Sequence, residues 1–169
     1  MIVALDVHYL EGRSARAAAL WFDAWQDPSA AGTATRIVEG VADYHPGRFF
    51  ERELPPLLAI LQETPTPSVV IVDGYCALDE KGSQGLGAYL AQHLASNTRI
   101  VGVAKRRFRG STHAVEILRG ESQRPLFVTA VGVPAKEAAR SVQSMHGTSR
   151  IPTLLKQVDA LARKGESPD

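Results

Sequence analysis

Short apolar runs, separated by glycine, proline and polar clusters, divide the chain into predicted strands and helices. Residues 2–9 are rich in valine and isoleucine and too short for a typical helix, so we expect a strand with Asp6 in its middle. A second run, 68–72, leads directly into Asp73 and Gly74, which is typical of a strand buried on both faces. Further strands are predicted at 99–104, 114–118 and 125–130.

The stretch that follows the first strand leaves two alternatives open. Residues 14–25 are rich in alanine, which favours a helix by propensity, whereas residues 33–44 have the β-branched pattern of a strand. Two strands that continue the first as a meander satisfy the same composition. Local propensity does not decide between a helix and a strand for residues 14–25.

Helices are predicted where apolar periodicity follows a proline or ends near a glycine. Because Leu54 precedes a proline, the first continuous helix is expected to begin at Pro55, with Glu53 at its start, where a carboxylate is electrostatically favoured. An amphipathic pattern predicts a second helix at 84–95. Two more are expected at 134–146, closed by Gly147, and from 152 to about 163.

The order of these elements predicts an α/β fold with a partly antiparallel sheet. A length of 169 residues and 44% apolar composition fit a single domain over residues 1–163, followed by a polar tail at 164–169. No apolar run is long enough to span a bilayer, and the N-terminus lacks the pattern of a signal peptide. One cysteine, Cys76, allows no internal disulfide and no cysteine-rich metal site, which predicts a cytoplasmic protein.

The net charge of +1 makes any argument for a nucleic-acid partner depend on local clusters. The cluster Lys105–Arg109 is one, and we expect Arg106, Arg107 and Arg109 to follow a phosphate backbone. Phe108 within this run is expected to pin the loop rather than to stack on a base.

Three acidic residues fall where neighbouring elements bring them together. Asp6 and Asp73 approach one another if their strands are neighbours, and Glu53 joins them from a helix. Such carboxylates repel, so either one is protonated or a hard cation such as Mg²⁺ or Mn²⁺ lies between them. Asp159, at the margin of the last helix's apolar face, fits a solvent-edge acid and a fourth ligand equally well. Lys105 ends a strand as Asp73 does, and two interpretations stay open: a cation that neutralises developing phosphate charge or orients a water, and a charged strand terminus in a basic loop.

Seven segments resemble, in order and spacing, the motif series of the endonuclease V family. They are Asp6-Val7, Tyr44-His45-Pro46-Gly47, Arg52-Glu53-Leu54-Pro55, Val72-Asp73-Gly74, Ile100-Val101-Gly102-Val103-Ala104-Lys105, Arg124-Pro125-Leu126-Phe127-Val128 and Arg150-Ile151-Pro152. The resemblance spans nearly the whole chain and implies a ribonuclease H-like mixed sheet flanked by helices, which favours a strand for residues 14–25. It also implies metal-dependent phosphodiester hydrolysis in nucleic-acid repair, near deaminated purines, with inosine in DNA or RNA as the usual target.

The resemblance also implies roles for individual residues. Asp6, Glu53 and Asp73 match the family's metal-binding acids, so a Mg²⁺-dependent endonuclease is expected, with Mn²⁺ as a substitute. Lys105 matches the active-site lysine, and Asp159 falls where the family has Asp or His after its Arg-Leu-Pro motif. The aromatic residue of the wedge motif, which helps to separate the strands at the lesion, is Tyr44.

The segment after Asp73 departs from the family pattern. The family normally has a His-Pro-Arg run there, which helps to form the hypoxanthine pocket, whereas this chain has Tyr75–Gly82 with none of these residue types. The family's Gly-His after a later strand is Gly132-Val133 here. A weak preference for inosine is therefore expected. Two alternatives stay open: a nucleic-acid-binding module of the same fold without productive cleavage, and a nuclease with another lesion or structure as its target.

Overall fold

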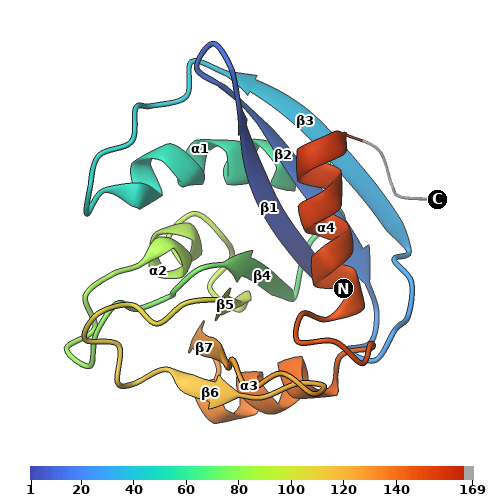
Figure 1. Cartoon of the computed structure of the whole chain (residues 1–169). Coiled ribbons are helices and arrows are strands. Elements are labelled where there is room, and N and C mark those ends of the chain that lie inside the picture. The colour runs from blue at the N-terminus through green and yellow to red at the C-terminus, as the bar shows by residue number, and fades with distance from the viewer. Residues whose placement is uncertain (166–169) are drawn as a thin grey trace.

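One mixed sheet of seven strands forms the centre of the computed structural model, which describes residues 1–165 (Figure 1). The strands are β1 (Ile2–Leu10), β2 (Ser14–Phe22), β3 (Gly32–Glu39), β4 (Val69–Asp73), β5 (Arg99–Ala104), β6 (Val115–Ile117) and β7 (Leu126–Val131). Their order in the sheet is β3-β2-β1-β4-β5-β7-β6. The first three strands form an antiparallel meander, β4 and β5 run parallel to β1, and β7 is antiparallel to both β5 and β6. The predicted α/β fold with a mixed sheet is confirmed.

Helices cover both faces of this sheet. They are α1 (Phe49–Leu61), α2 (Leu86–Ala91), α3 (Ala135–Ser144) and α4 (Thr153–Lys164). One face is covered by α3 and α4, and the opposite face by α1 and α2. Figure 1 shows α4, in red, running along β1 and β2, with α1 on the other side of these strands. Two hydrophobic cores result, one on each face of the sheet.

The alanine-rich stretch is a strand, as the resemblance implied. Because β2 pairs with β1 on one side and with β3 on the other along nearly its whole length, its backbone groups are satisfied by the sheet. Ala17 and Ala19 pack into the core beneath α1, and Ala18 into the core beneath α4. These three small side chains are fully buried, so the tertiary packing outweighs the helical propensity of alanine.

The prediction that the first helix begins at Pro55 is wrong. α1 begins at Phe49 and contains both prolines of the segment in its interior, although each proline removes one backbone hydrogen bond from the helix. A tertiary contact holds the N-terminal part of the helix: the Phe50 ring stacks on Tyr89 of α2, with 3.7 Å between the centroids. Glu53 therefore lies inside the helix, one turn beyond its start.

The second helix is much shorter than the predicted 84–95. α2 ends at Ala91, and the residues after it form turns closed by hydrogen bonds to the carbonyl three residues back, such as His93 N–H to Leu90 O. This tighter pattern is that of a 3₁₀ turn rather than an α-helix.

The third helix also ends before its predicted cap. α3 stops at Ser144, and Gly147 lies beyond it, because Met145 adopts an extended conformation. The Met145 carbonyl accepts a hydrogen bond from the buried guanidinium of Arg119 at 2.5 Å, which holds the chain in this course.

The last helix is closed by Gly165, whose φ of 80° is favoured by glycine. Since α4 includes Lys164, the predicted polar tail at 164–169 begins within the helix, and residues 166–169 lie outside the described residues. Of the helices in residues 1–165, none is both long and apolar enough to cross a membrane.

Cys76 is fully buried just after the end of β4. Its backbone N–H donates to the Thr129 hydroxyl at 2.8 Å, and its thiol donates weakly to the Ile100 carbonyl at 3.8 Å. A Cβ added to Gly87 of α2 would lie 2.4 Å from Cys76 Sγ, so only glycine at this position allows the helix to pack this closely against the thiol. Burial raises the pKa of the Cys76 thiol to about 12. This side chain is therefore a packing element.

Candidate active site

Two acids and a lysine meet on three neighbouring strands: Asp73 ends β4 and Lys105 follows β5, whereas Asp6 lies in the middle of β1, where its pairing with β4 ends. β1 and β4 are parallel and pair Leu5 with Val72, so the next residues along, Asp6 and Asp73, lie side by side. Lys105 follows the end of the adjacent parallel strand, β5. Because side chains alternate between the faces of a sheet, all three point toward the face that α4 covers.

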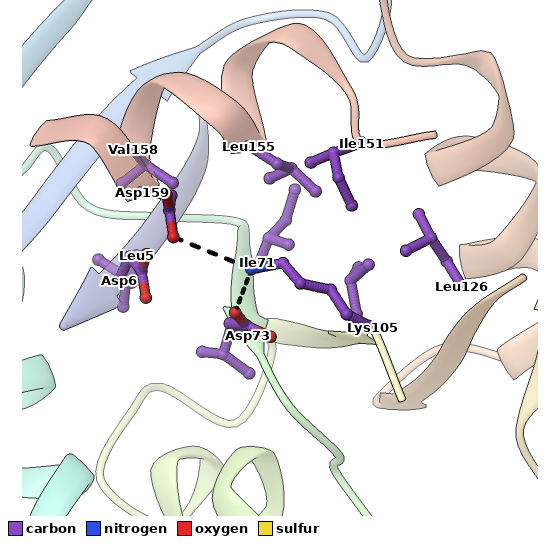
Figure 2. Close-up of a pocket in the computed structure, with 12 residues that line it drawn as sticks. Leu5, Asp6, Ile71, Asp73, Lys105, Leu126, Ile151, Leu155, Val158 and Asp159 are labelled. Atoms are coloured by element: carbon purple, nitrogen blue, oxygen red, sulfur yellow. Dashed lines mark hydrogen bonds and ion pairs between the residues drawn. The ribbon is translucent and has the colours of Figure 1, made fainter. Parts of the chain in front are cut away.

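These three side chains and Asp159 of α4 line a small cavity of about 30 Å³ (Figure 2). Figure 2 shows Lys105 reaching between Asp73 and Asp159. Its Nζ lies 2.7 Å from Asp73 Oδ2 and 3.9 Å from Asp159 Oδ1. The other walls are apolar and are formed by Leu5, Ile71, Val72, Val103, Leu126, Ile151, Leu155 and Val158. A volume of this size fits a water molecule or an ion rather than a nucleoside.

The electrostatics of the cavity disfavour a charged Asp6. Burial, followed by the neighbouring charge of Asp73, raises the pKa of Asp6 to about 7, and Asp159 adds to this effect. A hydrogen bond from the Val7 N–H at 2.9 Å and the charge of Lys105 act in the opposite direction. A cation bound next to the Asp6 carboxylate would therefore stabilise its ionised form.

Glu53 approaches the same end of the sheet from α1, on the opposite face, and does not line the cavity. Only 8% exposed, it accepts a hydrogen bond from the Tyr9 hydroxyl at 2.5 Å. Burial raises the pKa of Glu53 to about 7; the bond from Tyr9 lowers it, and the charges of Asp6 and Asp73 raise it. Glu53 therefore lies within the electrostatic range of both other acids, although Tyr9 holds its carboxylate.

The positive charge in the cavity belongs to Lys105. Burial lowers the pKa of Lys105, but the hydrogen bond and charge of Asp73 outweigh burial, and the net shift is upward. Lys105 therefore stays protonated at neutral pH. Asp159 has a second cationic partner besides Lys105: the guanidinium of Arg163, one helical turn later, donates to its carboxylate at 2.9 Å and 3.2 Å.

Arg150 fixes the backbone of the site and was not singled out from the sequence as a functional residue. Its guanidinium donates to the carbonyls of Lys105 at 2.5 Å, Pro125 at 2.9 Å and Arg124 at 2.9 Å. It thereby ties the end of β5 to the start of β7. The sequence marks Arg150 only as part of the Arg-Ile-Pro motif. The carbonyls that accept its hydrogen bonds are 25 to 45 residues away along the chain, so no local sequence pattern predicts these contacts.

The contact between Tyr9 and Arg52 was also not predicted from the sequence. The Arg52 guanidinium lies 3.5 Å above the centroid of the Tyr9 ring, and Tyr9 in turn holds Glu53. Together with Tyr44 they line a separate cavity of about 180 Å³. The strand alternation that places Tyr9 on the face of Leu5 and so toward α1 is the only sequence signal for this arrangement.

The predicted nucleic-acid contacts lie outside the small cavity. Tyr44 is 58% exposed in the loop between β3 and α1, on the side of Glu53. Arg106 and Arg109 are exposed in the loop after β5, whereas Arg107 forms an ion pair with Glu116 of β6. The structure thus places exposed cations next to Lys105 and the exposed aromatic side chain nearer to Glu53.

A sequence profile of the endonuclease V family matches residues 1–142. The chain belongs to the endonuclease V family. Solved structures of endonuclease V share its fold. An enzyme from Ciona intestinalis, solved with a 24mer DNA that contains an inosine followed by a ribo-adenosine, gives a TM-score of 0.78 at 21% identity, covering 97% of this chain and 84% of that one. Comparison with curated protein sequences gives no match.

Two further endonuclease V structures agree. The human protein gives a TM-score of 0.75 at 22% identity, over 97% of this chain and 83% of that one. The protein from Streptomyces avermitilis gives 0.76 at 23% identity, over 97% of this chain and 80% of that one. Although the profile stops at residue 142, the structural likeness extends over the part of the chain that carries Arg150 and Asp159.

The donors of this candidate site fit a hard divalent cation. They are carboxylates, without thiol or imidazole groups, and hard cations such as Mg²⁺ prefer oxygen ligands. Burial and, after it, repulsion by Asp73 raise the pKa of Asp6, and a bound cation would offset both effects by stabilising the ionised carboxylate. Among residues 1–165, no three Asp, Glu, His or Cys side chains are grouped closely enough to hold an ion as they stand.

Proposed function

We propose that this protein is a Mg²⁺-dependent endonuclease that hydrolyses phosphodiester bonds in DNA or RNA near deaminated bases such as inosine. The observation that carries the proposal is the cluster of Asp6, Asp73 and Lys105 on three neighbouring strands, with Asp159 facing it from α4. Such a cluster is costly to maintain for stability alone, because the carboxylates repel one another and are partly removed from water.

Asp6, Glu53 and Asp73 are the residues that would hold the metal, and Mn²⁺ would serve in its place. A divalent ion held there would supply an activated water and neutralise charge on the phosphate. Glu53 has a hydrogen bond from Tyr9 that favours its ionised form, so this acid is available as a ligand near neutral pH.

Lys105 acts on the phosphate directly in this proposal. Its side chain is 41% exposed, so the ammonium is accessible to a phosphate oxygen and would stabilise negative charge that develops there. Asp159 orients the ammonium from the opposite side. The exposed Arg106 and Arg109, on the same loop, hold the flanking phosphates of the strand.

The choice of substrate rests on the family and on the Ciona complex with inosine-containing DNA. In this chain the segment after Asp73 turns inward: Tyr75 is 8% exposed and Cys76 is fully buried. Neither side chain offers a polar edge to an extruded base. We therefore infer a weak preference for inosine over undamaged or mismatched bases, with Tyr44 separating the strands of a duplex.

The second candidate is a nucleic-acid-binding protein that does not cleave. One observation favours it: Lys105 already forms ion pairs with Asp73 and Asp159, so two of the carboxylates have a cationic partner without a metal. In that case the basic loop would bind phosphates while the cavity stays closed to the metal.

Cleavage of single-stranded and duplex oligonucleotides, with and without inosine, tests the proposal in Mg²⁺ or Mn²⁺. We expect metal-dependent cleavage that is lost in Asp73→Ala, with the circular dichroism spectrum unchanged. Cleavage by Asp73→Ala at the rate of the unmodified protein would refute the mechanism, and binding without cleavage in either metal would favour the second candidate.

A further inference from the structure

Phe108 exposes an apolar ring in the middle of the basic loop, residues 105–109. The side chain is 45% exposed, and its neighbours Arg106 and Arg109 are exposed as well. Arg107 is exposed too, but it is ion-paired with Glu116, and its guanidinium lies 5.1 Å from the centroid of the Phe127 ring. The loop therefore presents one aromatic face between two cations.

The ring is not needed to pin the loop, contrary to the expectation from sequence. The buried Tyr75 does so through the backbone: its hydroxyl accepts the Phe108 N–H at 3.0 Å and donates to the Arg106 carbonyl at 2.9 Å. Ser111 adds a hydrogen bond from its hydroxyl to the Phe108 carbonyl at 2.6 Å. The Phe108 ring touches Tyr75 only at an inclined angle, with 6.1 Å between centroids and 56° between planes.

This arrangement preorganises an exposed aromatic face. A loop held by hydrogen bonds on both sides of Phe108 loses little freedom when a ligand covers the ring, so little binding free energy is lost to ordering. Exposure of a large apolar ring to water is otherwise unfavourable. A phenyl ring has no hydrogen-bonding group, so it accepts any flat partner without regard to its polar edge.

We propose that Phe108 is a stacking platform for an unpaired base of a single-stranded nucleic acid. Basic grooves that carry exposed aromatic rings bind single strands in this way, with phosphates on the cations and bases on the rings. Lys105 is three residues away, so the two α-carbons are at most about 10 Å apart. The stacked base thus belongs to a nucleotide close to the phosphate that Lys105 contacts.

The proposal rests on the proposed function for the phosphate contact and defines its substrate class. In a duplex both faces of an internal base are covered by its neighbours, so only an unpaired or frayed nucleotide can stack on Phe108. Single-stranded or locally opened nucleic acid is therefore the preferred substrate of this site.

Binding of fluorescein-labelled oligothymidylate, measured by anisotropy with EDTA present, tests the inference without cleavage. Phe108→Ala is expected to weaken binding about tenfold, since stacking one base contributes 1–3 kcal/mol. An oligomer of equal length with abasic sites carries the same phosphates and no bases, and its affinity should not change. Phe108→Trp should keep the affinity for oligothymidylate, and its emission should be quenched on binding.

Ile37→Ala is the matched control, because Ile37 is equally exposed, at 47%, on the edge strand β3. It should bind as the unmodified protein does. An equal loss on the abasic oligomer, or no loss for Phe108→Ala, would overturn the inference. If Phe108→Ala behaves as expected but no cleavage is seen in Mg²⁺ or Mn²⁺, the nuclease proposal fails alone; if the unmodified protein binds no oligonucleotide, both fail.

Discussion

Single residues of the site differ in how the protein controls their charge. Asp6 and Glu53 both have pKa values raised to about 7, chiefly by burial, but only Glu53 receives a hydroxyl hydrogen bond that favours the ionised form. Lys105 is held in the charged form by Asp73. At neutral pH the site thus combines one permanent cation with two acids near their midpoints, so its net charge responds to pH and to a bound cation.

The raised pKa of Asp6 makes the metal-free protein lose stability as pH rises. The folded state binds the proton more tightly than the unfolded state, whose pKa is near 3.8, so the free energy of unfolding falls between about pH 4 and pH 7. Asp6→Asn should reduce this fall, with Glu53 still contributing its share, and should stabilise the protein at pH 8 by about 1–2 kcal/mol. Thermal unfolding in EDTA at pH 5 and pH 8 measures the pH dependence of the stability of each variant, with Asp23→Asn, a change at an exposed residue, as the control. An unchanged pH dependence in Asp6→Asn would contradict the assignment.

Removal of the Lys105 ammonium should affect the chemical step more than binding. Lys105→Ala is expected to lower kcat by about 10²–10³-fold, the cost of losing one preorganised charge at a transition state. Single-turnover cleavage at saturating protein measures this rate. Lys156→Ala, on the exposed side of α4, is the control and should cleave normally. A loss confined to KM would make Lys105 a binding residue.

At the scale of elements, the loops that carry the site are fixed by side chains from distant segments. The loop between α3 and α4 is held by the buried Arg119, which donates to the carbonyls of Met145, Gly147 and Ser149. The basic loop is held by Tyr75. The positions of Asp159 and of the loop cations therefore depend on side chains that contact no substrate.

Arg119 should be among the residues most important for stability. Arg119→Met leaves the buried Met145 carbonyl and the carbonyls of Gly147 and Ser149 without this donor, and we expect the free energy of unfolding to fall by about 3 kcal/mol. The corresponding decrease in Tm is roughly 6–12 °C. Arg140→Met, an exposed change on α3, should leave Tm within about 1 °C, as surface substitutions usually do. A Tm of Arg119→Met close to that of Arg140→Met would show that water satisfies the carbonyls.

The two exposed arginines of the basic loop should set the salt dependence of binding. Arg106→Ala with Arg109→Ala removes two phosphate contacts and should reduce the slope of log Kd against log salt by about 1.4–1.8. Binding of unrelated sequences should weaken equally. Arg107→Ala should change the slope less, because Arg107 is paired with Glu116. Equal slopes for the double variant and the unmodified protein would exclude phosphate contact by this loop.

For the whole molecule, the sequence predicts the order of elements better than their lengths or contacts. Apolar runs located β4 and β5 because these strands are buried on both faces, and their ends located Asp73 and Lys105. The start of α1 was missed because stacking of Phe50 on Tyr89, far away in the chain, outweighs the effect of proline. The bond of Tyr9 to Glu53 joins residues 44 apart, and no local pattern encodes it.

Cleavage of a duplex should depend on the exposed side chain of Tyr44. Tyr44→Ala removes the exposed aromatic side chain on the side of Glu53 and should reduce cleavage of duplex about tenfold or more, since opening a base pair costs a few kcal/mol. Cleavage of single strands should change little. Parallel assays on inosine-containing duplex and single strand give the ratio. An equal loss on both substrates would mean that Tyr44 contacts the strand without separating it.

The burial of Cys76 makes the molecule convenient for spectroscopy. The thiolate is the nucleophile that attacks a maleimide, and this thiol is both inaccessible and hard to deprotonate. A maleimide dye should therefore leave the native protein unlabelled. A cysteine introduced at an exposed position, such as Arg109, would be the single labelling site, and the distance from that loop to a dye on an oligonucleotide would become measurable without first replacing the native thiol.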